Sequence, residues 1–123
     1  MIQLKRVYER PEFKDGLTVL VDRLWPRGVR KSTPNVDIWL KRIAPSDKLR
    51  KWYRHDPKKW KRFRIRYLKE LDKNKEVENL LMLIEDNDPI TFVYGSSECR
   101  RNNATVLKEY MERKLRKLNG RRR

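Results

Sequence analysis

Arginine and aspartate side chains follow a predicted buried strand at residues 17–22, and they are the first groups in the chain that could bind or transform a substrate. Asp22, Arg23 and Arg27 lie in a run that also contains a proline and a glycine, which together predict a rigid turn. Planar guanidinium groups on such a turn suit a phosphate or a carboxylate. This turn therefore predicts one half of an anion site.

A second polar segment follows the strand predicted at residues 90–94 and leads into a helix predicted from about residue 103. A helix start offers unpaired backbone N–H groups and the positive end of the helix dipole to an anion. Ligands of parallel sheets bind past the carboxyl ends of the strands, so we expect the two segments to enclose one pocket. The predicted ligand-binding residues are Arg23, Trp25, Arg27, Tyr94, Ser96, Asn102 and Asn103.

The same residues also have a purely structural interpretation. Asp22 could pair with Arg23 or Arg27 to fix the turn, because an aspartate beside an arginine is a common brace. Trp25 would then belong to the core. The residue pattern leaves both interpretations open.

Candidate catalytic groups are few. Asp22 and Glu98 would form a carboxylate pair for acid–base chemistry if the fold brought them together. His55 is the single histidine; it could act as a general acid or base, or could be a packed residue just before a helix N-cap. The lone Cys99 lacks the arginine six positions later that a phosphatase loop requires. The sequence predicts no metal and no cofactor, and whether the protein is an enzyme stays open.

Positive charge is the dominant feature of the composition, with a formal net charge of +16 from 33 basic and 17 acidic residues. The excess is concentrated in residues 41–75 and 99–123, whereas residues 76–98 contain no lysine or arginine. Concentrated positive charge favours sequence-independent binding of nucleic acid, although a solvated face would have the same composition. The residues predicted for this alternative share one helix face: Lys58, Arg62, Arg66 and Lys69.

Several short elements must position these groups. Apolar runs predict strands at residues 2–8, 17–22 and 90–94. Apolar stripes at helical spacing predict helices after Pro34 (Val36, Trp39, Leu40, Ile43), over 46–54, from Pro57 to about Leu71, over 76–87 and over about 103–118. The alternation predicts an α/β fold: a single small domain over residues 1–118, a three-layer-like sandwich with a short, mainly parallel sheet flanked by helices. Residues 119–123 are predicted to be a flexible basic tail.

One charged residue and one link remain open at this level. Arg64 lies on the apolar face of the 57–71 helix, so it either extends to solvent or has a buried anionic partner. The link between the first two strands is short for a crossover, so their relative direction is not predicted.

The cellular setting follows from what the sequence lacks. No apolar run approaches the roughly 18–20 residues of a membrane span, and the N-terminus has no apolar block typical of a signal peptide. The single cysteine cannot form an internal disulfide. We therefore expect a cytoplasmic protein whose partner is a small anionic ligand or a nucleic acid and not a membrane; the oligomeric state is not predicted.

Four motifs resemble the YeaO-like branch of the domain of unknown function family 488, over roughly residues 1–116. They are Leu-Val-Asp-Arg-Leu-Trp-Pro-Arg-Gly at 20–28, Trp-Leu-Lys at 39–41, Ala-Pro-Ser with Leu-Arg-Lys-Trp at 44–52, and His-Asp-Pro-x-x-Trp-x-x-Phe at 55–63. The resemblance implies an α/β fold with a pocket built from these motifs, and it implies no particular activity. The loop after residue 94 departs from the family pattern: it retains an acidic group, Glu98, but lacks a Lys/Arg-Asp pair, so no role is carried over for that pair.

Overall fold

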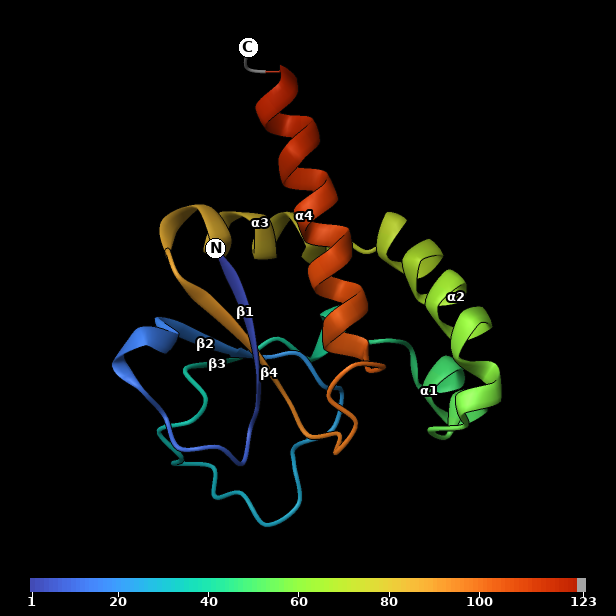
Figure 1. Ribbon diagram of the computed structural model, residues 1–123, viewed down its shortest axis with the longest axis horizontal. Helices are drawn as coiled ribbons and strands as arrows, with labels where there is room; N and C mark the ends of the chain where they lie inside the picture. The colour runs from blue at the N-terminus through green and yellow to red at the C-terminus, as the bar shows by residue number, and fades with distance from the viewer. Residues whose placement is uncertain (122–123) are drawn as a thin grey trace.

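A four-stranded parallel sheet forms the centre of the computed structural model, which describes residues 1–121. The strands lie in the order β1-β4-β2-β3, and each neighbouring pair is parallel. Figure 1 shows the helices gathered to one side of this sheet. The predicted α/β class is therefore confirmed, and β4 between β1 and β2 makes the first two strands parallel to each other. The strands are β1 (Ile2–Arg6), β2 (Leu17–Leu20), β3 (Ile38–Trp39) and β4 (Ile90–Tyr94).

The α-helices begin close to where the sequence predicts. The Ser46 hydroxyl accepts a hydrogen bond from the backbone N–H of Leu49 at 3.1 Å, and Asp56 accepts one from the N–H of Lys58 at 3.0 Å, so both predicted N-caps are present. The α-helices are α1 (Asp47–Tyr53), α2 (Trp60–Asp72), α3 (Glu76–Asp86) and α4 (Asn103–Arg121). Short 3-10 helices are η1 (Phe13–Asp15), η2 (Lys41–Ile43) and η3 (Pro57–Lys59).

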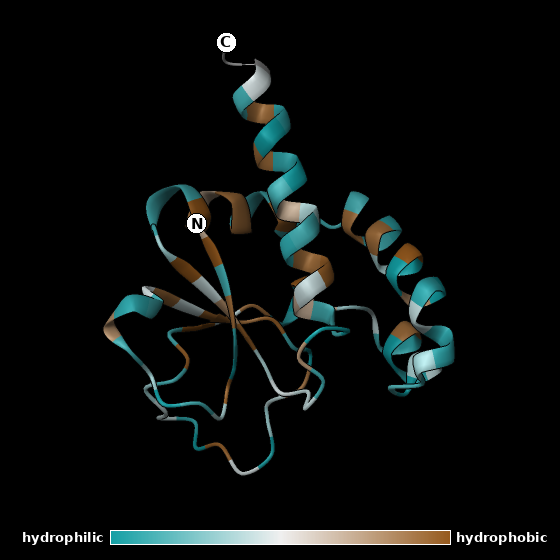
Figure 2. Ribbon diagram, viewed as in Figure 1, coloured by the Kyte–Doolittle hydropathy of each residue, from teal (hydrophilic) through white to brown (hydrophobic). Residues whose placement is uncertain are grey.

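The two faces of the sheet are covered differently. Val19 and Phe92 are paired in the register and belong to the large cluster that includes the apolar residues of α1 to α4. Their neighbours Leu20 and Val93 point to the opposite face, into a small cluster with Trp25 and other residues of the coil that follows β2. The hydrophobic stretches of the strands in Figure 2 fit burial on both faces.

The prediction of a helix after Pro34 is wrong. The structure instead has the edge strand β3, followed by η2. Thr18 fixes this pairing, because its N–H and hydroxyl both donate to the Asp37 carboxylate, at 2.8 and 3.0 Å, and Val19 and Leu20 then pair with β3. The stripe from Val36 to Ile43 is too short to outweigh these interstrand bonds, since helical stability depends mainly on packing of a longer face.

Helices α2 and α4 pack against each other and against the sheet through α4. Arg64 of α2 has an anionic partner: its Nε donates to Glu109 Oε2 at 3.0 Å, and its Nη2 donates to the other carboxylate oxygen. Arg64 on the apolar face of α2 therefore forms an ion pair with a half-buried glutamate of α4.

Helix α4 continues to Arg121, beyond the end predicted at Leu118. The first part of the predicted flexible tail is therefore helical, and residues 122 and 123 lie outside the described residues. Figure 1 shows the C-terminal half of α4 extending away from the rest of the chain. No helix within residues 1–121 combines the length and the apolar character needed to cross a membrane.

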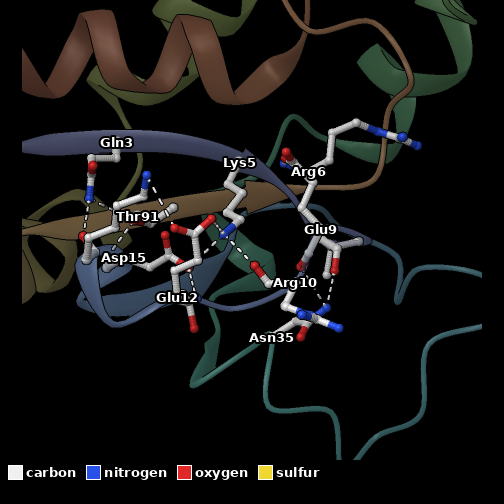
Figure 3. A network of polar contacts seen from close by, with 12 residues as sticks. Gln3, Lys5, Arg6, Glu9, Arg10, Glu12, Asp15, Asn35 and Thr91 are labelled. Atoms are coloured by element: carbon white, nitrogen blue, oxygen red, sulfur yellow. Dashed lines mark hydrogen bonds and ion pairs between the residues drawn. The ribbon is translucent and has the colours of Figure 1, made fainter.

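A buried ion pair links β1 to the segment that connects β1 and β2 (Figure 3). Lys5 Nζ lies 2.9 Å from Asp15 Oδ2, and the two side chains are only 13% and 8% exposed. Burial alone would raise the pKa of Asp15, but the Lys5 hydrogen bond, the Glu12 N–H and the charges of Lys5 and Lys14 together lower it. The ionised carboxylate is thus the form that stabilises this link.

Replacing that carboxylate provides a test of the buried pair. Asp15→Asn is expected to lower the free energy of unfolding by about 2 kcal/mol at pH 7, because it leaves the Lys5 ammonium partly uncompensated. Folding lowers the pKa of Asp15. The full loss of stability is therefore expected at pH values above the pKa of an unfolded aspartate, about 3.9, and the loss becomes smaller as the pH falls through the pKa of folded Asp15. Urea unfolding at several pH values measures it. Glu12→Gln, which alters a half-exposed carboxylate 3.7 Å from the same lysine, should cost under about 0.5 kcal/mol; equal costs would contradict the assignment.

Candidate functional site

A pocket of about 530 Å³ opens at the carboxyl ends of β2 and β4. Segments far apart in the sequence enclose it. Asp22, Arg23 and Leu24 follow β2; Gly95 and Ser96 follow β4; Arg50, Lys51 and Tyr53 belong to α1. The remaining lining residues are Tyr8, Ala44, Pro45, Arg54, His55, Phe63, Arg101, Asn102 and Asn103. The pocket lies past the strand ends, where the site is predicted, and its role in ligand binding stays a prediction.

The topology explains why a crevice forms at this point. After β2 the chain continues to β3 at the edge of the sheet, whereas after β4 it enters α4, which packs on β4 and β1. Connections that leave neighbouring parallel strands in opposite directions leave the space between the strand ends open. Helix α1 and the start of α2 then provide the outer wall.

The pocket wall is strongly positive. Five of its side chains carry a permanent positive charge, Arg23, Arg50, Lys51, Arg54 and Arg101, and Asp22 is the one carboxylate among its lining residues. Charges that line a concave surface concentrate counter-ions there. The electrostatics of this hollow therefore favour an anion.

Asp22 is a structural brace, although not the one considered from the sequence. Its Oδ2 accepts a hydrogen bond from the N–H of Gly95 at 2.7 Å, and its Oδ1 accepts one from the Asn103 amide at 3.0 Å. Within residues 1–121 it forms no ion pair with Arg23 or Arg27. Burial raises the pKa of Asp22, although the Asn103 and Gly95 hydrogen bonds and the nearby His55 act in the opposite direction. One carboxylate thus ties the ends of β2 and β4 to the start of α4.

Arg23 supports the opposite rim of the pocket. Its Nε donates to the carbonyl of Pro45 at 2.9 Å, and its Nη2 donates to the carbonyl of Ala44 at 3.2 Å. Arg23 therefore fixes the segment between η2 and α1 while its guanidinium group also lines the pocket. Its positive charge is not neutralised by these neutral acceptors.

Asn102 and Asn103 anchor the start of α4 at the pocket. Asn102 is buried; its Oδ1 accepts from the N–H of Thr105 at 3.0 Å, and its amide donates to the carbonyl of Glu98 at 2.7 Å. The Asn103 amide donates to the carbonyl of Val21 at 3.0 Å and to Asp22. The two predicted residues thus act first as a helix cap and a link to β2, and through these roles they hold the positive end of the α4 dipole at the pocket.

Three predicted ligand-binding residues lie outside the pocket wall. Trp25 packs edge-on against Trp39 with ring centroids 5.3 Å apart, and its indole N–H donates to the carbonyl of Val29 at 2.7 Å. Arg27 is exposed, and its carbonyl accepts a hydrogen bond from the Tyr8 hydroxyl at 3.0 Å. Tyr94 is buried at the end of β4. Burial and the adjacent Cys99 thiol raise the pKa of Tyr94 to about 12.

Two of the three candidate catalytic groups line the pocket, and the third does not. His55 lines the pocket with an exposed side chain, and Asp22 lines it as a brace, but Glu98 is exposed outside the pocket wall. Glu98 Oε1 accepts from the N–H of Arg101, within its own loop. No cluster of three or more His, Cys, Asp or Glu side chains in residues 1–121 is arranged to hold a metal ion.

Helix α1 contributes pocket residues that sequence reasoning missed. Arg50 and Lys51 line the wall from α1 itself, and Arg54 follows it, next to the predicted candidate His55. Arg54 and His55 both have positive φ, 48° and 58°, a region that residues with side chains rarely occupy. One sequence signal could have identified Arg50 and Arg54 as a pair. They are four residues apart, and residues at that spacing lie on the same side of a helical turn.

The basic face of α2 remains a separate feature. Lys58, Arg62, Arg66 and Lys69 are all exposed, and none of the four forms an ion pair in the part of the chain that the structure describes. Arg66 is the one held in place, with its guanidinium carbon 4.2 Å from the centroid of the Trp52 ring. None of these residues lines the pocket.

The Asp22 brace gives a direct test of the site's architecture. Asp22→Ala is expected to lower the free energy of unfolding by about 2 kcal/mol, because it leaves the Gly95 N–H and the Asn103 amide without their acceptor. Glu98→Ala removes the same charge from an exposed position and should cost under about 0.5 kcal/mol. Chemical denaturation of both variants measures the difference, and similar values would show that Asp22 is not a brace.

Comparisons with known proteins agree with this fold and these motifs. The chain is 39% identical over 110 residues to the uncharacterized protein YeaO of Escherichia coli strain K12, which covers 89% of this chain and 96% of the relative. It is 38% identical to the uncharacterized protein Rv3073c of Mycobacterium tuberculosis strain H37Rv, over 89% of this chain and 92% of the relative. No solved structure matches the chain. The family model described as the inactive DUF488-N3 subclade matches residues 1–123, so the resemblance seen in the motifs is confirmed and the chain belongs to that DUF488 subclade.

Proposed function

We propose that this protein binds a small anionic ligand, bearing phosphate or carboxylate groups, in the pocket at the carboxyl ends of β2 and β4. The observation that carries the proposal is the charge of the wall: five cationic side chains face one carboxylate, and that carboxylate is already hydrogen-bonded to Gly95 and Asn103. An anion would therefore enter a hollow where nothing fully compensates the positive charge.

Arg50 is the group best placed to bind such an anion. Its Nε is buried and has no hydrogen-bond partner among the described residues. Its Nη2 interacts with Asp47 at 3.3 Å, at the exposed start of α1. A buried donor without an acceptor is destabilising, so a shift of the Arg50 side chain that let a ligand oxygen accept from Nε would supply the missing partner.

Binding without chemical conversion fits the site better than catalysis. Glu98 is not among the residues that line the pocket, so within the described residues Asp22 is the only carboxylate in its wall. The description of the subclade as inactive supports the same conclusion. We therefore assign His55 and the arginines to ligand recognition.

Removing Arg50 tests the proposed pocket. In the parent chain, inorganic pyrophosphate should raise the melting temperature in proportion to ligand concentration, because only the folded state has the site. Arg50→Ala should weaken pyrophosphate binding about tenfold or more, as expected for the loss of a charge-assisted hydrogen bond. Differential scanning fluorimetry and titration calorimetry measure the two quantities.

Two controls distinguish binding in the pocket from non-specific attraction of an anion to a basic surface. Arg116→Ala removes the same charge from α4, about 20 Å along that helix from Asn103, and should bind pyrophosphate like the parent chain. Sodium chloride at equal ionic strength should give a smaller shift. If neither pyrophosphate, phosphate nor citrate stabilised the protein, or if Arg116→Ala weakened binding as much as Arg50→Ala, the proposal would be wrong.

A second candidate function, sequence-independent binding of nucleic acid, is supported by the basic face of α2, whose side chains are exposed and form no ion pair within residues 1–121. A protein that contacts the phosphates of single strands loses affinity with salt at a slope of about −0.7 for each phosphate neutralised. The double variant Lys58→Ala/Arg62→Ala should therefore flatten the slope by about 1.4 in fluorescence anisotropy with a random oligonucleotide. An unchanged slope would remove this face from the interaction.

A further inference from the structure

The size and lining of the pocket exceed what an inorganic anion requires. About 530 Å³ lies within the range of roughly 300–1,000 Å³ that is usual for pockets holding organic ligands. Two exposed rings, Tyr8 and His55, line the same hollow as the arginines. Rings beside cations suit a ligand with both a phosphate and a flat organic part, such as a nucleotide.

Further positively charged side chains, outside the pocket wall, lie on η3 and α2. Next to Lys51 in the pocket wall, the Trp52 ring lies beneath the Arg66 guanidinium, at 4.2 Å, and the Lys59 ammonium, at 5.0 Å. Lys59 also donates to the carbonyl of Trp52 at 2.9 Å. These contacts hold two positive charges where α1 packs on α2, the two helices that contribute Lys51 and Phe63 to the pocket wall.

A row of exposed cations extends this surface along α2. Lys58, Arg62 and Arg66 recur every four residues. Arg62 and Arg66 lie on one side of α2 at a step of about 6 Å, and Lys58 precedes them in η3. None of them has a carboxylate partner among the described residues. A regular row of unpaired cations complements a polymer that carries one phosphate in each repeat.

The pocket itself is better matched to the end of such a polymer than to its interior. A phosphate monoester carries close to two negative charges at neutral pH, whereas a phosphodiester carries one. The cations that line the hollow, Arg23, Arg50, Arg54 and Arg101 among them, outnumber its single carboxylate. The terminal group can therefore gain more from the pocket than an internal phosphate.

We infer that the ligand is the phosphorylated end of a single-stranded nucleic acid, with the terminal nucleotide in the pocket and the following phosphates along the α1–α2 surface. This inference rests on the proposed anion-binding function of the pocket. The terminal base stacks on Tyr8, with His55 lining the same hollow, and Arg50 binds the terminal phosphate. A phosphopeptide would fill the pocket but would leave the basic row of α2 without partners.

The test compares ligands that differ only at the end of the chain. Ten-nucleotide single strands with a 5′-phosphate, a 3′-phosphate or two hydroxyl ends compete against an internally labelled strand in fluorescence anisotropy. One phosphorylated end should bind about tenfold more tightly than the hydroxyl-ended strand, and adenosine monophosphate should bind more weakly than that phosphorylated strand. Lys58→Ala/Arg62→Ala should weaken the strand but leave adenosine monophosphate unchanged.

Variants at Tyr8 separate stacking from simple charge. Tyr8→Ala should weaken adenosine monophosphate about tenfold and leave inorganic pyrophosphate unchanged, because only the nucleotide has a base. Tyr8→Phe, which retains the ring, should bind nucleotide like the parent chain. Because the Tyr8 side chain is exposed, both variants are expected to fold, which their melting temperatures check.

The outcomes distinguish this inference from the function on which it rests. If pyrophosphate binds but phosphorylated and hydroxyl-ended strands bind equally, the inference is wrong and the pocket remains an anion site. The same conclusion follows if a phosphotyrosine peptide binds as tightly as the phosphorylated strand. If pyrophosphate, mononucleotide and all strands fail to bind, the proposed function itself is wrong.

Discussion

The carboxylate of Asp22 holds together the part of the molecule that all functional arguments use. It accepts one hydrogen bond from the residue after β4 and another from the first turn of α4, while its own residue follows β2. Two chain segments that lie more than seventy positions further along the sequence are thereby fixed to the end of β2. Burial of this charge is tolerated because its donors are in place before any ligand arrives.

The arrangement of the strands and helices around Asp22 explains why a pocket forms there. Parallel strands β2 and β4 end side by side, their connections diverge, and α4 begins at the rim with its positive dipole end toward the hollow. Arg23 ties the opposite rim to the segment before α1, and α1 then brings Arg50 and Lys51 to the wall. Two cations of the wall thus belong to α1, and a third, Arg23, is held by hydrogen bonds to the segment before it.

The predictable features of the sequence were those governed by local rules. The β4 run and the N-caps at Ser46 and Asp56 were found because a short apolar strand and a capping side chain each leave a local signature. The helix expected after Pro34 failed because a long-range bond from Thr18 to Asp37 selected a strand. Trp25 and Arg27 were misplaced for a related reason: a turn shows which residues are adjacent, but not which side of the sheet they face.

The α1 contribution to the pocket also depends on tertiary packing, since nothing local shows that Arg50 faces the ends of two distant strands. The central claim is that these arginines surround one anion site. Nitrogen-edited NMR of the arginine Nε–H groups, recorded during a pyrophosphate titration, tests it most directly. The account predicts that the Arg50 and Arg54 signals shift and saturate together at a ligand concentration that leaves Arg116 unmoved. Gradual shifts of similar size at all surface arginines would contradict it.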